Sequence, residues 1–218
     1  NASDAVSMVQ IAEGSMNEMT NILVRMRELT VQSASDTVGD KERGFLNREY
    51  TQLVDEMDRI AATTEFNGNK FFRAEDKNEL FIQVGVTSEA DSALSINLDN
   101  LKFDSEALGL GKGEEIGSDS GSLARSDIAG KLDTIDIALS RIASERATLG
   151  SLQSRLTSTI GNLDINVENM NTARSRIKDV DFAAETANMA QTRILTQSNT
   201  AVLGQANAVP ELALQLLR

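Results

Sequence analysis

Two pairs of acidic residues are the side chains in this sequence best suited to acid–base or metal chemistry. They are Glu114 with Glu115, and Asp179 with Asp181. Paired carboxylates can share a proton or hold a hard cation. However, the chain has no His and no Cys, so imidazole and thiolate ligands, cysteine nucleophiles and the commonest general base are all missing. The first pair lies in a polar, glycine-rich stretch, and the second lies near an expected helix start, where carboxylates favour the helix dipole. We therefore expect no catalytic residue, no metal site and no enzyme activity.

The stretch GLGKG at residues 109–113 superficially suggests a phosphate-binding loop. That motif requires a Gly-Lys-Ser/Thr ending and follows a strand closely, because the loop must present its backbone N–H groups and a lysine to the phosphates. This sequence has neither feature. We therefore expect no nucleotide and no other cofactor.

The charge balance argues against two classes of partner. Acidic residues exceed basic ones by 33 to 21, which gives a net charge of -12, and no Lys/Arg cluster offsets it locally. Such a chain is repelled by nucleic acid and by anionic membranes. No run approaches the roughly 20 apolar residues that cross a bilayer, and no signal-peptide pattern opens the sequence. We expect neither nucleic-acid binding nor membrane insertion.

The elements that carry these residues are mostly helices. Apolar residues recur at three and four positions in two stretches, which predicts helices over 4–35 and 40–64. The first stripe comprises Met8, Ala12, Met16, Met19, Leu23 and Met26, widened by Ile22 and Leu29. The second comprises Leu46, Tyr50, Leu53, Met57 and Ile60. Aromatic residues make up only 4% of the chain, and this suits packed helices better than a wide globular core.

The middle of the sequence is less regular. Asn67-Gly68 is a turn dipeptide that tolerates positive φ. Two short, partly alternating apolar stretches predict a β-hairpin over 79–98. Residues 104–122 are rich in Gly, Ser and acidic residues, which favours an exposed loop.

A third helix is predicted over 123–175. Its apolar seam has a mean spacing close to the 3.5 residues of a coiled coil. The seam comprises Leu132, Ile135, Leu139, Ile142, Leu149, Leu152, Leu156, Ile160, Leu163, Val167 and Met170. The first two helices are its expected partners in an antiparallel bundle. The fold class is therefore mainly α: a long helical bundle or coiled-coil rod with a small β-hairpin. At this point an ordinary helical bundle remains an equal alternative.

The last part of the chain predicts a helix of another kind. Residues 194–210 carry no charge, yet apolar residues keep helical spacing among Ser, Thr, Asn and Gln. A helix on the surface of a monomer normally turns a charged face to water. Packing on every side favours uncharged polar residues, because an unpaired buried charge is costly. We expect this helix to pack within a lattice of molecules.

Several long strings resemble bacterial flagellin. In the first half they are NASDAVSMVQIAEGS at residues 1–15, VRMRELTVQSA at 24–34 and TEFNGNKFF at 64–72. In the second half they are RIASERATLGSLQSRL at 141–156, DVDFAAETANMAQTRIL at 179–195 and QANAVPELALQLLR at 205–218. Their length and order make the resemblance far more specific than a short motif.

The resemblance implies a structural subunit that self-assembles into the helical tubular filament of the extracellular flagellum and serves motility. It implies an outer-core rod domain over 1–175 and a C-terminal inner-core helix over 176–218. The family is exported through the flagellar type III apparatus. The implied partners are other copies of the chain, a flagellar export chaperone, and the filament cap and hook-junction proteins.

The sequence departs from the family pattern in two ways. The family carries a further N-terminal segment before the position of Asn1, which pairs with the C-terminal helix, so we expect this stretch alone to polymerise poorly. The short middle indicates a core-only flagellin. A hook–filament junction protein, or a secreted coiled-coil interaction or translocator module, are the alternatives. The close match over RELTVQSA and VPELALQLLR argues against a junction protein.

The resemblance also implies two sets of contact residues. Arg25, Leu29 and Glu49 match positions through which the family contacts a vertebrate innate immune receptor, although a solvated or subunit-facing role is the alternative for Arg25 and Glu49. The C-terminal helix is expected to pack on other subunits or on the chaperone. The residues expected to do so are Phe182, Met189, Ile194, Leu195, Val202, Leu203, Val209, Leu212, Leu216 and Leu217.

Overall fold

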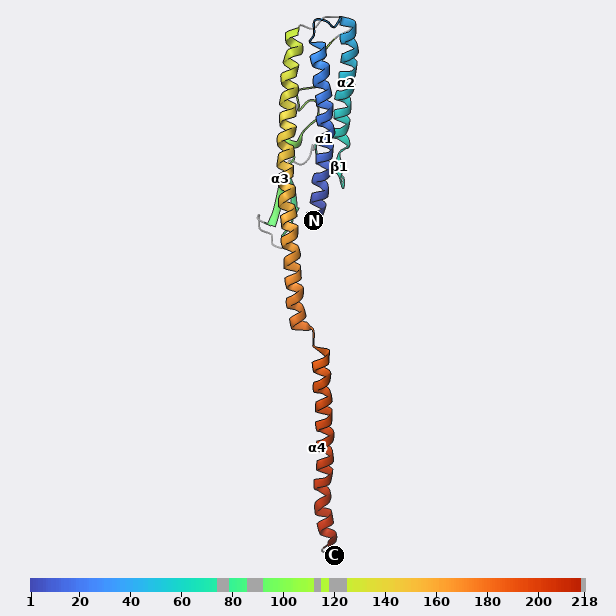
Figure 1. The fold of residues 1–218 in the computed structure, drawn as a ribbon, viewed down its shortest axis with the longest axis vertical. Coiled ribbons are helices and arrows are strands. Elements are labelled where there is room, and N and C mark those ends of the chain that lie inside the picture. The colour runs from blue at the N-terminus through green and yellow to red at the C-terminus, as the bar shows by residue number, and fades with distance from the viewer. Residues whose placement is uncertain (74–78, 86–91, 112–114, 118–124, 217–218) are drawn as a thin grey trace. The chain divides into compact units, whose positions relative to one another are not determined.

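The computed structural model describes residues 1–73, 79–85, 92–111, 115–117 and 125–216, except for the side chains of residues 125 and 209–216. The chain forms two compact units, Asn1–Leu163 and Asp164–Arg218. Helices dominate both units (Figure 1). The predicted fold class is therefore confirmed, with long helices and, in the described residues, two small antiparallel strand pairs.

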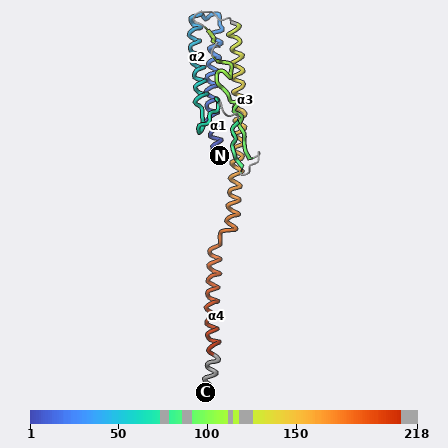
Figure 2. The backbone as a smooth tube through the Cα atoms, turned by 180° about the vertical axis from the view of Figure 1, so that it is seen from behind, coloured from blue at the N-terminus to red at the C-terminus, as the bar shows by residue number. Residues whose placement is uncertain are grey.

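The first unit is organised around helix α1, Ala2–Ser33. It lies between α2, Asp40–Thr63, and α3, Arg125–Lys178, and runs antiparallel to both (Figures 1 and 2). The predicted stripe forms the face of α1 that packs into the core, because its spacing places every member on one side of the helix. Its buried members are Met8, Ala12, Met16, Met19, Leu23, Met26 and Leu29.

The other two helices of this unit bury the stripes that the spacing predicts. In α2, Tyr50 and Met57 are buried, and Leu46, Leu53 and Ile60 pack against the same core while half-buried. In α3, the buried seam residues are Ile135, Ile142, Leu149, Leu152 and Leu156. The helices begin and end within three residues of the predicted positions.

Two short hairpins extend the bundle. Strands β1, Glu65–Phe66, and β2, Asn69–Lys70, are joined by Asn67 and Gly68, whose φ angles of 51° and 79° confirm the positive-φ turn. Strands β3, Glu79–Gln83, and β4, Ala93–Asn97, form the predicted antiparallel hairpin, with Glu79 opposite Asn97 and Gln83 opposite Ala93. The 3-10 helix η2, Asp99–Leu101, follows β4.

The prediction of an exposed loop over 104–122 is wrong for much of what the structure describes there. We call residues 102–111 and 115–117 the clasp segment. Leu108, Leu110 and Ile116 are buried in it, and Phe103 just before the predicted loop is also buried. The apolar side chains enter the core although polar residues surround them in the sequence.

Hydrogen bonds from all three helices fix the clasp segment. Ser33 Oγ of α1 donates to the Ile116 carbonyl over 2.6 Å, and the Ile116 N–H donates to Asn47 Oδ1 of α2 over 3.0 Å. Arg141 of α3 donates to the Ala107 carbonyl over 3.0 Å. The two bonds to Ile116 satisfy backbone groups that burial would otherwise leave without partners, which is why a polar segment can pack here.

The second unit holds the end of α3 and helix α4, Phe182–Leu216. The compact first unit ends at Leu163, whereas the division at residue 175 between an outer-core and an inner-core part stays a prediction. The seam residues beyond that point are not buried: Val167 is 55% exposed and Met170 is 68% exposed. The apolar periodicity of α3 therefore continues beyond the part of the helix whose apolar side chains are buried within the subunit.

Candidate assembly surfaces

The structure describes three of the four paired acidic residues, Glu115, Asp179 and Asp181. Asp181 lies directly before α4, and its Oδ1 accepts hydrogen bonds from the N–H groups of Ala183 and Ala184 over 3.0 and 3.2 Å. This is an N-cap, which satisfies donors that the first helical turn leaves free. Asp179 is exposed, and its N–H donates to the Ser175 carbonyl at the end of α3.

The described part of the glycine-rich stretch belongs to the clasp segment. Gly109 adopts a positive φ of 73° in the clasp segment, and Gly111 packs near the backbone of Glu106. Glu115 is exposed, whereas Gly113 and Glu114 lie outside the described residues. Within the described part of the chain, no three His, Cys, Asp or Glu side chains converge as a metal site would require. None of the described helices is long and apolar enough to span a bilayer.

The structure brings Arg25 and Glu49 together on the surface of the first unit. Arg25 Nε donates to Glu49 Oε1 over 2.7 Å, and Arg25 Nη1 donates to Glu28 Oε2 over 2.9 Å. The hydrogen bond to Glu49, and after it the one to Glu28, raises the pKa of Arg25 above its usual value. All three side chains remain about half exposed. They form a charged surface patch that joins α1 to α2.

Leu29 does not belong to that surface. Its side chain is fully buried in the core, although Arg25 lies only one helical turn away. Positions four residues apart are rotated by about 40° around the helix axis, and this rotation places Leu29 in the buried apolar stripe while Arg25 stays on the surface. The expectation that Leu29 makes a direct surface contact is therefore corrected.

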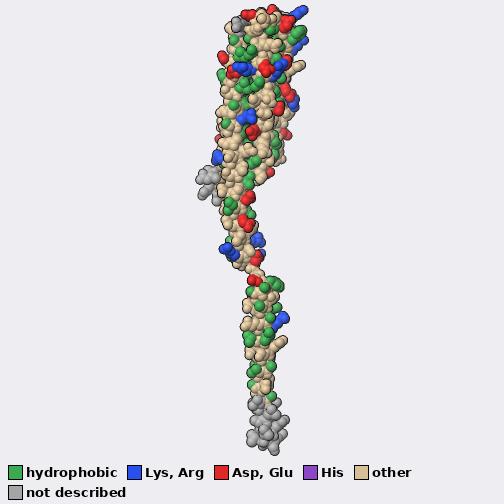
Figure 3. Space-filling model, viewed as in Figure 1, with side chains coloured by type: hydrophobic (Ala, Val, Ile, Leu, Met, Phe, Trp, Pro, Cys, Tyr) green, Lys and Arg blue, Asp and Glu red, His purple; other side chains and the backbone are tan. Residues whose placement is uncertain are grey.

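Helix α4 carries large apolar side chains that are exposed along its length, here called the apolar row of α4. The members whose side chains the structure describes are between 49% and 79% exposed (Figure 3). They are Phe182, Met189, Ile194, Leu195, Val202 and Leu203. Val209, Leu212 and Leu216 lie in the helix without described side chains, and Leu217 lies outside the described residues. Exposed apolar surfaces of this kind are typical of sites that contact another molecule.

A further surface feature, not anticipated from the sequence, lies between α1 and α2. It is a groove of about 670 Å³, here called the α1–α2 groove, and Ile11, Gly14 and Ile22 of α1 line it. Glu56, Arg59 and Ile60 line it from α2. One signal was available in the sequence: Gly14, a weak helix former, lies within the first helix one turn after Ile11, which falls outside the buried stripe.

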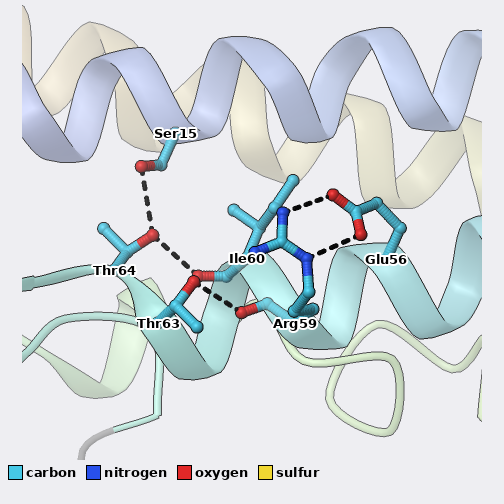
Figure 4. A network of polar contacts seen from close by, with 6 residues as sticks. All are labelled: Ser15, Glu56, Arg59, Ile60, Thr63 and Thr64. Carbon is cyan, nitrogen blue, oxygen red and sulfur yellow. Dashed lines mark hydrogen bonds and ion pairs between the residues drawn. The ribbon is translucent and has the colours of Figure 1, made fainter.

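Hydrogen bonds hold the α2 side of this groove in place (Figure 4). Arg59 donates to both carboxylate oxygens of Glu56, over 2.7 and 2.6 Å. Thr64 Oγ1 lies 3.1 Å from Ser15 Oγ and 2.7 Å from the Ile60 carbonyl, so it connects the end of α2 to α1. The pKa of Glu56 is lowered by its hydrogen bond from Arg59. The groove is therefore a pre-formed surface.

Comparisons with known proteins bear on these surfaces. Residues 1–77 match the bacterial flagellin N-terminal helical region, and residues 132–217 match the bacterial flagellin C-terminal helical region. A flagellin of Halalkalibacterium halodurans is 40% identical over 218 residues, which cover 100% of this chain and 76% of that protein. Flagellin FlaB1 of Treponema pallidum is 35% identical, with coverage of 100% and 78%.

A solved structure agrees with these relatives. The crystal structure of Bacillus cereus flagellin superposes with a TM-score of 0.62 at 30% identity, and covers 79% of this chain and 93% of that one. The two flagellin regions match in their family order, at the two ends of the sequence, and the relatives align along all of it. The chain therefore belongs to the bacterial flagellin family, and it is a structural subunit of the extracellular flagellar filament rather than an enzyme.

Proposed function

We propose that this flagellin uses the apolar row of α4 as its principal packing surface inside the filament. The supporting observation is that Leu195, Val202 and Leu203 are each more than half exposed on a helix whose residues 194–210 carry no charge. Uncharged amide and hydroxyl side chains can be desolvated between helices at lower cost than charged ones. Helices of neighbouring copies supply the cover that these side chains lack.

Electron microscopy of the polymerised subunit tests this proposal. The double variant Leu195→Asp with Val202→Asp places two charges on the row, and we expect it to form no tubular filaments. The matched control is Leu195→Met with Val202→Ile, which keeps the surface apolar and close in volume, and should polymerise. Normal filaments from the charged variant would contradict the proposed role of α4. Discrete complexes from the full-length unmodified subunit, which includes the family's N-terminal segment, would contradict filament assembly itself.

The same row is the proposed contact for the flagellar export chaperone before assembly. A chaperone that covers an exposed apolar helix keeps the subunit soluble until export, because the surface is otherwise free to associate. The charged double variant should lose chaperone binding in a titration with purified chaperone, whereas the Met/Ile control should retain it. Equal binding by both variants would assign the chaperone to another surface.

Contacts with the filament cap and hook-junction proteins are proposed for the assembled subunit, and the same two variants test whether α4 carries them.

We further propose that Arg25 and Glu49 form a contact patch for the vertebrate innate immune receptor for flagellin. The supporting observation is their exposed, mutually bonded arrangement on α1 and α2. Arg25→Ala should reduce receptor signalling by the unassembled subunit. Arg59→Ala is a suitable control, because Arg59 is also an exposed arginine in an ion pair but lies outside the patch. A subunit that gives no signal before any substitution would remove the proposal.

A further inference from the structure

The turn between β1 and β2 contains a pair of residues that is chemically reactive in water. Asn67 is the one asparagine of the sequence that is followed by a glycine. The backbone nitrogen of the residue after an asparagine can attack the carbonyl carbon of the asparagine side chain. Glycine has no Cβ atom to hinder this approach. The structure around the pair then decides whether the two groups can reach each other.

The structure leaves both reacting groups accessible. Asn67 and Gly68 are exposed and form the two-residue loop of the hairpin. A Cβ atom added at Gly68 would meet nothing within 4 Å, so the space beside its nitrogen is open. Within the described part of the chain, no hydrogen bond holds the Asn67 side chain or the Gly68 N–H group. Neither group has to be released from a partner before it reacts.

The backbone of this turn also rearranges at low cost. Asn67 and Gly68 have φ angles of 51° and 79°, a region that asparagine tolerates and glycine adopts freely. The strands pair only through Glu65 with Lys70 and Phe66 with Asn69. A hairpin this short has few backbone hydrogen bonds, so it can open locally while the helices stay folded. Opening lets the Asn67 side chain rotate toward the Gly68 nitrogen.

Other asparagines in the first unit are less suited to the reaction. Asn17, Asn21 and Asn47 lie inside α1 and α2. The N–H group after each of them is engaged in the helix, and the helical backbone keeps it away from the side-chain carbonyl carbon. Asn69 lies half-buried in β2, and the side chain of the following Lys70 hinders the attack. Asn69 is therefore an internal reference in the same hairpin.

We propose that Asn67 is a site of spontaneous deamidation. The Gly68 nitrogen forms a bond with Cγ of Asn67, and the bond between Cγ and Nδ2 breaks. The proton of the Gly68 nitrogen passes to the departing amide, which leaves as ammonia, and a succinimide ring remains. Water then adds to one of the two ring carbonyls. Opening at one carbonyl gives aspartate, and opening at the other gives isoaspartate, in which the main chain continues through the side-chain carbon.

The two products differ in their effect on the turn. Aspartate tolerates positive φ as asparagine does, so it keeps the loop and adds one negative charge. Isoaspartate instead adds a carbon atom to the backbone of a loop whose length sets the register of Phe66 opposite Asn69. Strand β2 leads directly to Phe71 and Phe72, which are buried in the core. A shift of β2 therefore reaches the core.

The hairpin also supports the contact between α2 and α1. The Phe71 N–H donates to the Thr64 carbonyl over 3.4 Å, and Thr64 Oγ1 lies 3.1 Å from Ser15 Oγ. Thr64 also lines the α1–α2 groove. Isoaspartate at position 67 should therefore loosen this end of the groove, whereas aspartate should leave it in place.

Peptide mapping of the folded, unassembled subunit tests the proposal independently of polymerisation. The protein is incubated at pH 8.5, and samples taken over time are digested and analysed by mass spectrometry. We expect the amide of Asn67 to be lost about tenfold faster than that of Asn69, which corresponds to a difference of about 1.4 kcal/mol in activation free energy. Isoaspartate should appear together with aspartate, because the succinimide opens to both. Equal rates at the two asparagines, or aspartate without isoaspartate, would overturn the proposal.

Hydroxylamine gives a second readout, because it attacks the succinimide and cleaves the chain after residue 67. The folded subunit should yield two fragments, residues 1–67 and 68–218. The matched control is Asn67→Gly, which suits the same positive-φ turn but has no side chain to form the ring. It should stay intact. Cleavage of both proteins to the same extent, or of neither, would contradict a succinimide at this position.

Hydrogen exchange at the Phe71 N–H measures the effect on the groove. Subunits aged at pH 8.5 and enriched in isoaspartate should exchange this hydrogen faster than fresh subunits, whereas fresh Asn67→Asp, which carries only the added charge, should not. The Asn67→Gly variant, aged in the same way, should show no change with time. Equal exchange in aged and fresh unmodified subunits would overturn the predicted loosening of the turn.

Discussion

The Asp58 carboxylate accepts two hydrogen bonds from Ser105, one from the backbone N–H and one from Oγ, each 2.7 Å long. These two hydrogen bonds connect the clasp segment to α2, although the two residues are 47 positions apart in the sequence. Ser105 is only 7% exposed, so water cannot readily replace the carboxylate. We expect Asp58→Ala to lower the free energy of unfolding by about 1–3 kcal/mol, because it leaves a buried N–H group unsatisfied. Urea unfolding of the subunit measures this loss.

The control for this effect is Asp55→Ala in the same helix. Asp55 is exposed, and its substitution by Ala removes an equal charge. We expect this substitution to change the free energy of unfolding by less than about 0.5 kcal/mol. Similar losses for the two variants would show that helix charge, and not the clasp, accounts for the effect.

The ion pair between Arg27 and Asp136 predicts a pH-dependent contribution to stability. Arg27 Nε donates to Asp136 Oδ1 over 2.8 Å and joins α1 to α3. This hydrogen bond lowers the pKa of Asp136 below its ordinary value of about 3.9. A lowered pKa means that the contribution is complete above the unfolded value and disappears as the pH falls through the folded one. Asp136→Asn should therefore reduce stability at pH 6, and the difference from the unmodified subunit should vanish in strong acid.

Thermal unfolding between pH 6 and pH 2.5 at low and high salt checks this expectation. Both side chains are about half exposed, so added salt should weaken the difference. The Glu56–Arg59 pair lies within one helix turn of α2, and its loss should affect the contact between α1 and α3 much less. A difference that persists at the lowest pH would show that Asp136 acts through something other than its charge.

Substitutions at Leu29 and Arg25 should separate stability from receptor signalling: the first should lower the free energy of unfolding, and the second should lower signalling. Leu29→Ala removes a fully buried side chain and should lower the free energy of unfolding by about 2–5 kcal/mol. Arg25→Ala changes an exposed side chain and should leave the unfolding transition nearly unchanged. Calorimetry of both variants, together with receptor signalling, separates the two roles. If Arg25→Ala destabilised the fold as much as Leu29→Ala, reduced signalling could not be assigned to a surface contact.

Asp181 predicts a local effect at the start of α4. Asp181→Ala removes the side chain that caps Ala183 and Ala184, and should destabilise the first turn of the helix by about 0.5–2 kcal/mol. Faster amide hydrogen exchange at these two residues reports the loss directly. Asp179→Ala is the matched control, because Asp179 carries the same charge but, among the described residues, only its backbone N–H takes part in a hydrogen bond. Equal acceleration in both variants would exclude a specific cap.

The helices were predictable because their signal is local. The spacing of Met16, Met19 and Leu23 sets one side of α1 whatever packs against it, and all three are fully buried as predicted. The turn at Asn67 and Gly68 was predictable for the same reason, since its chemistry resides in two adjacent residues. In α3 the periodicity identified the helix but not the length over which it is covered.

The clasp segment and the α1–α2 groove could not be predicted in this way. Leu108, Leu110 and Ile116 enter the core among glycines and acidic residues, and their burial depends on Asp58 and Asn47, which are distant in sequence. Local composition carries no information about such partners. The groove likewise arises where two helices meet, so only Gly14 gave a local sign of it. Arg25 and Glu49 were singled out only through the resemblance to flagellin, and the hydrogen bond between them was not predicted.

The distribution of methionine between core and surface has a consequence for the chemical resistance of the filament protein. Met8, Met16, Met19, Met26 and Met57 are buried in the first unit, whereas Met170 and Met189 are exposed. Peroxide converts accessible methionine to the polar sulfoxide and reaches buried thioethers only when the fold opens. Mild oxidative attack on the folded subunit should therefore mark Met170 and Met189 first, and sulfoxide at the other five would record that the chain had been unfolded when it met the oxidant.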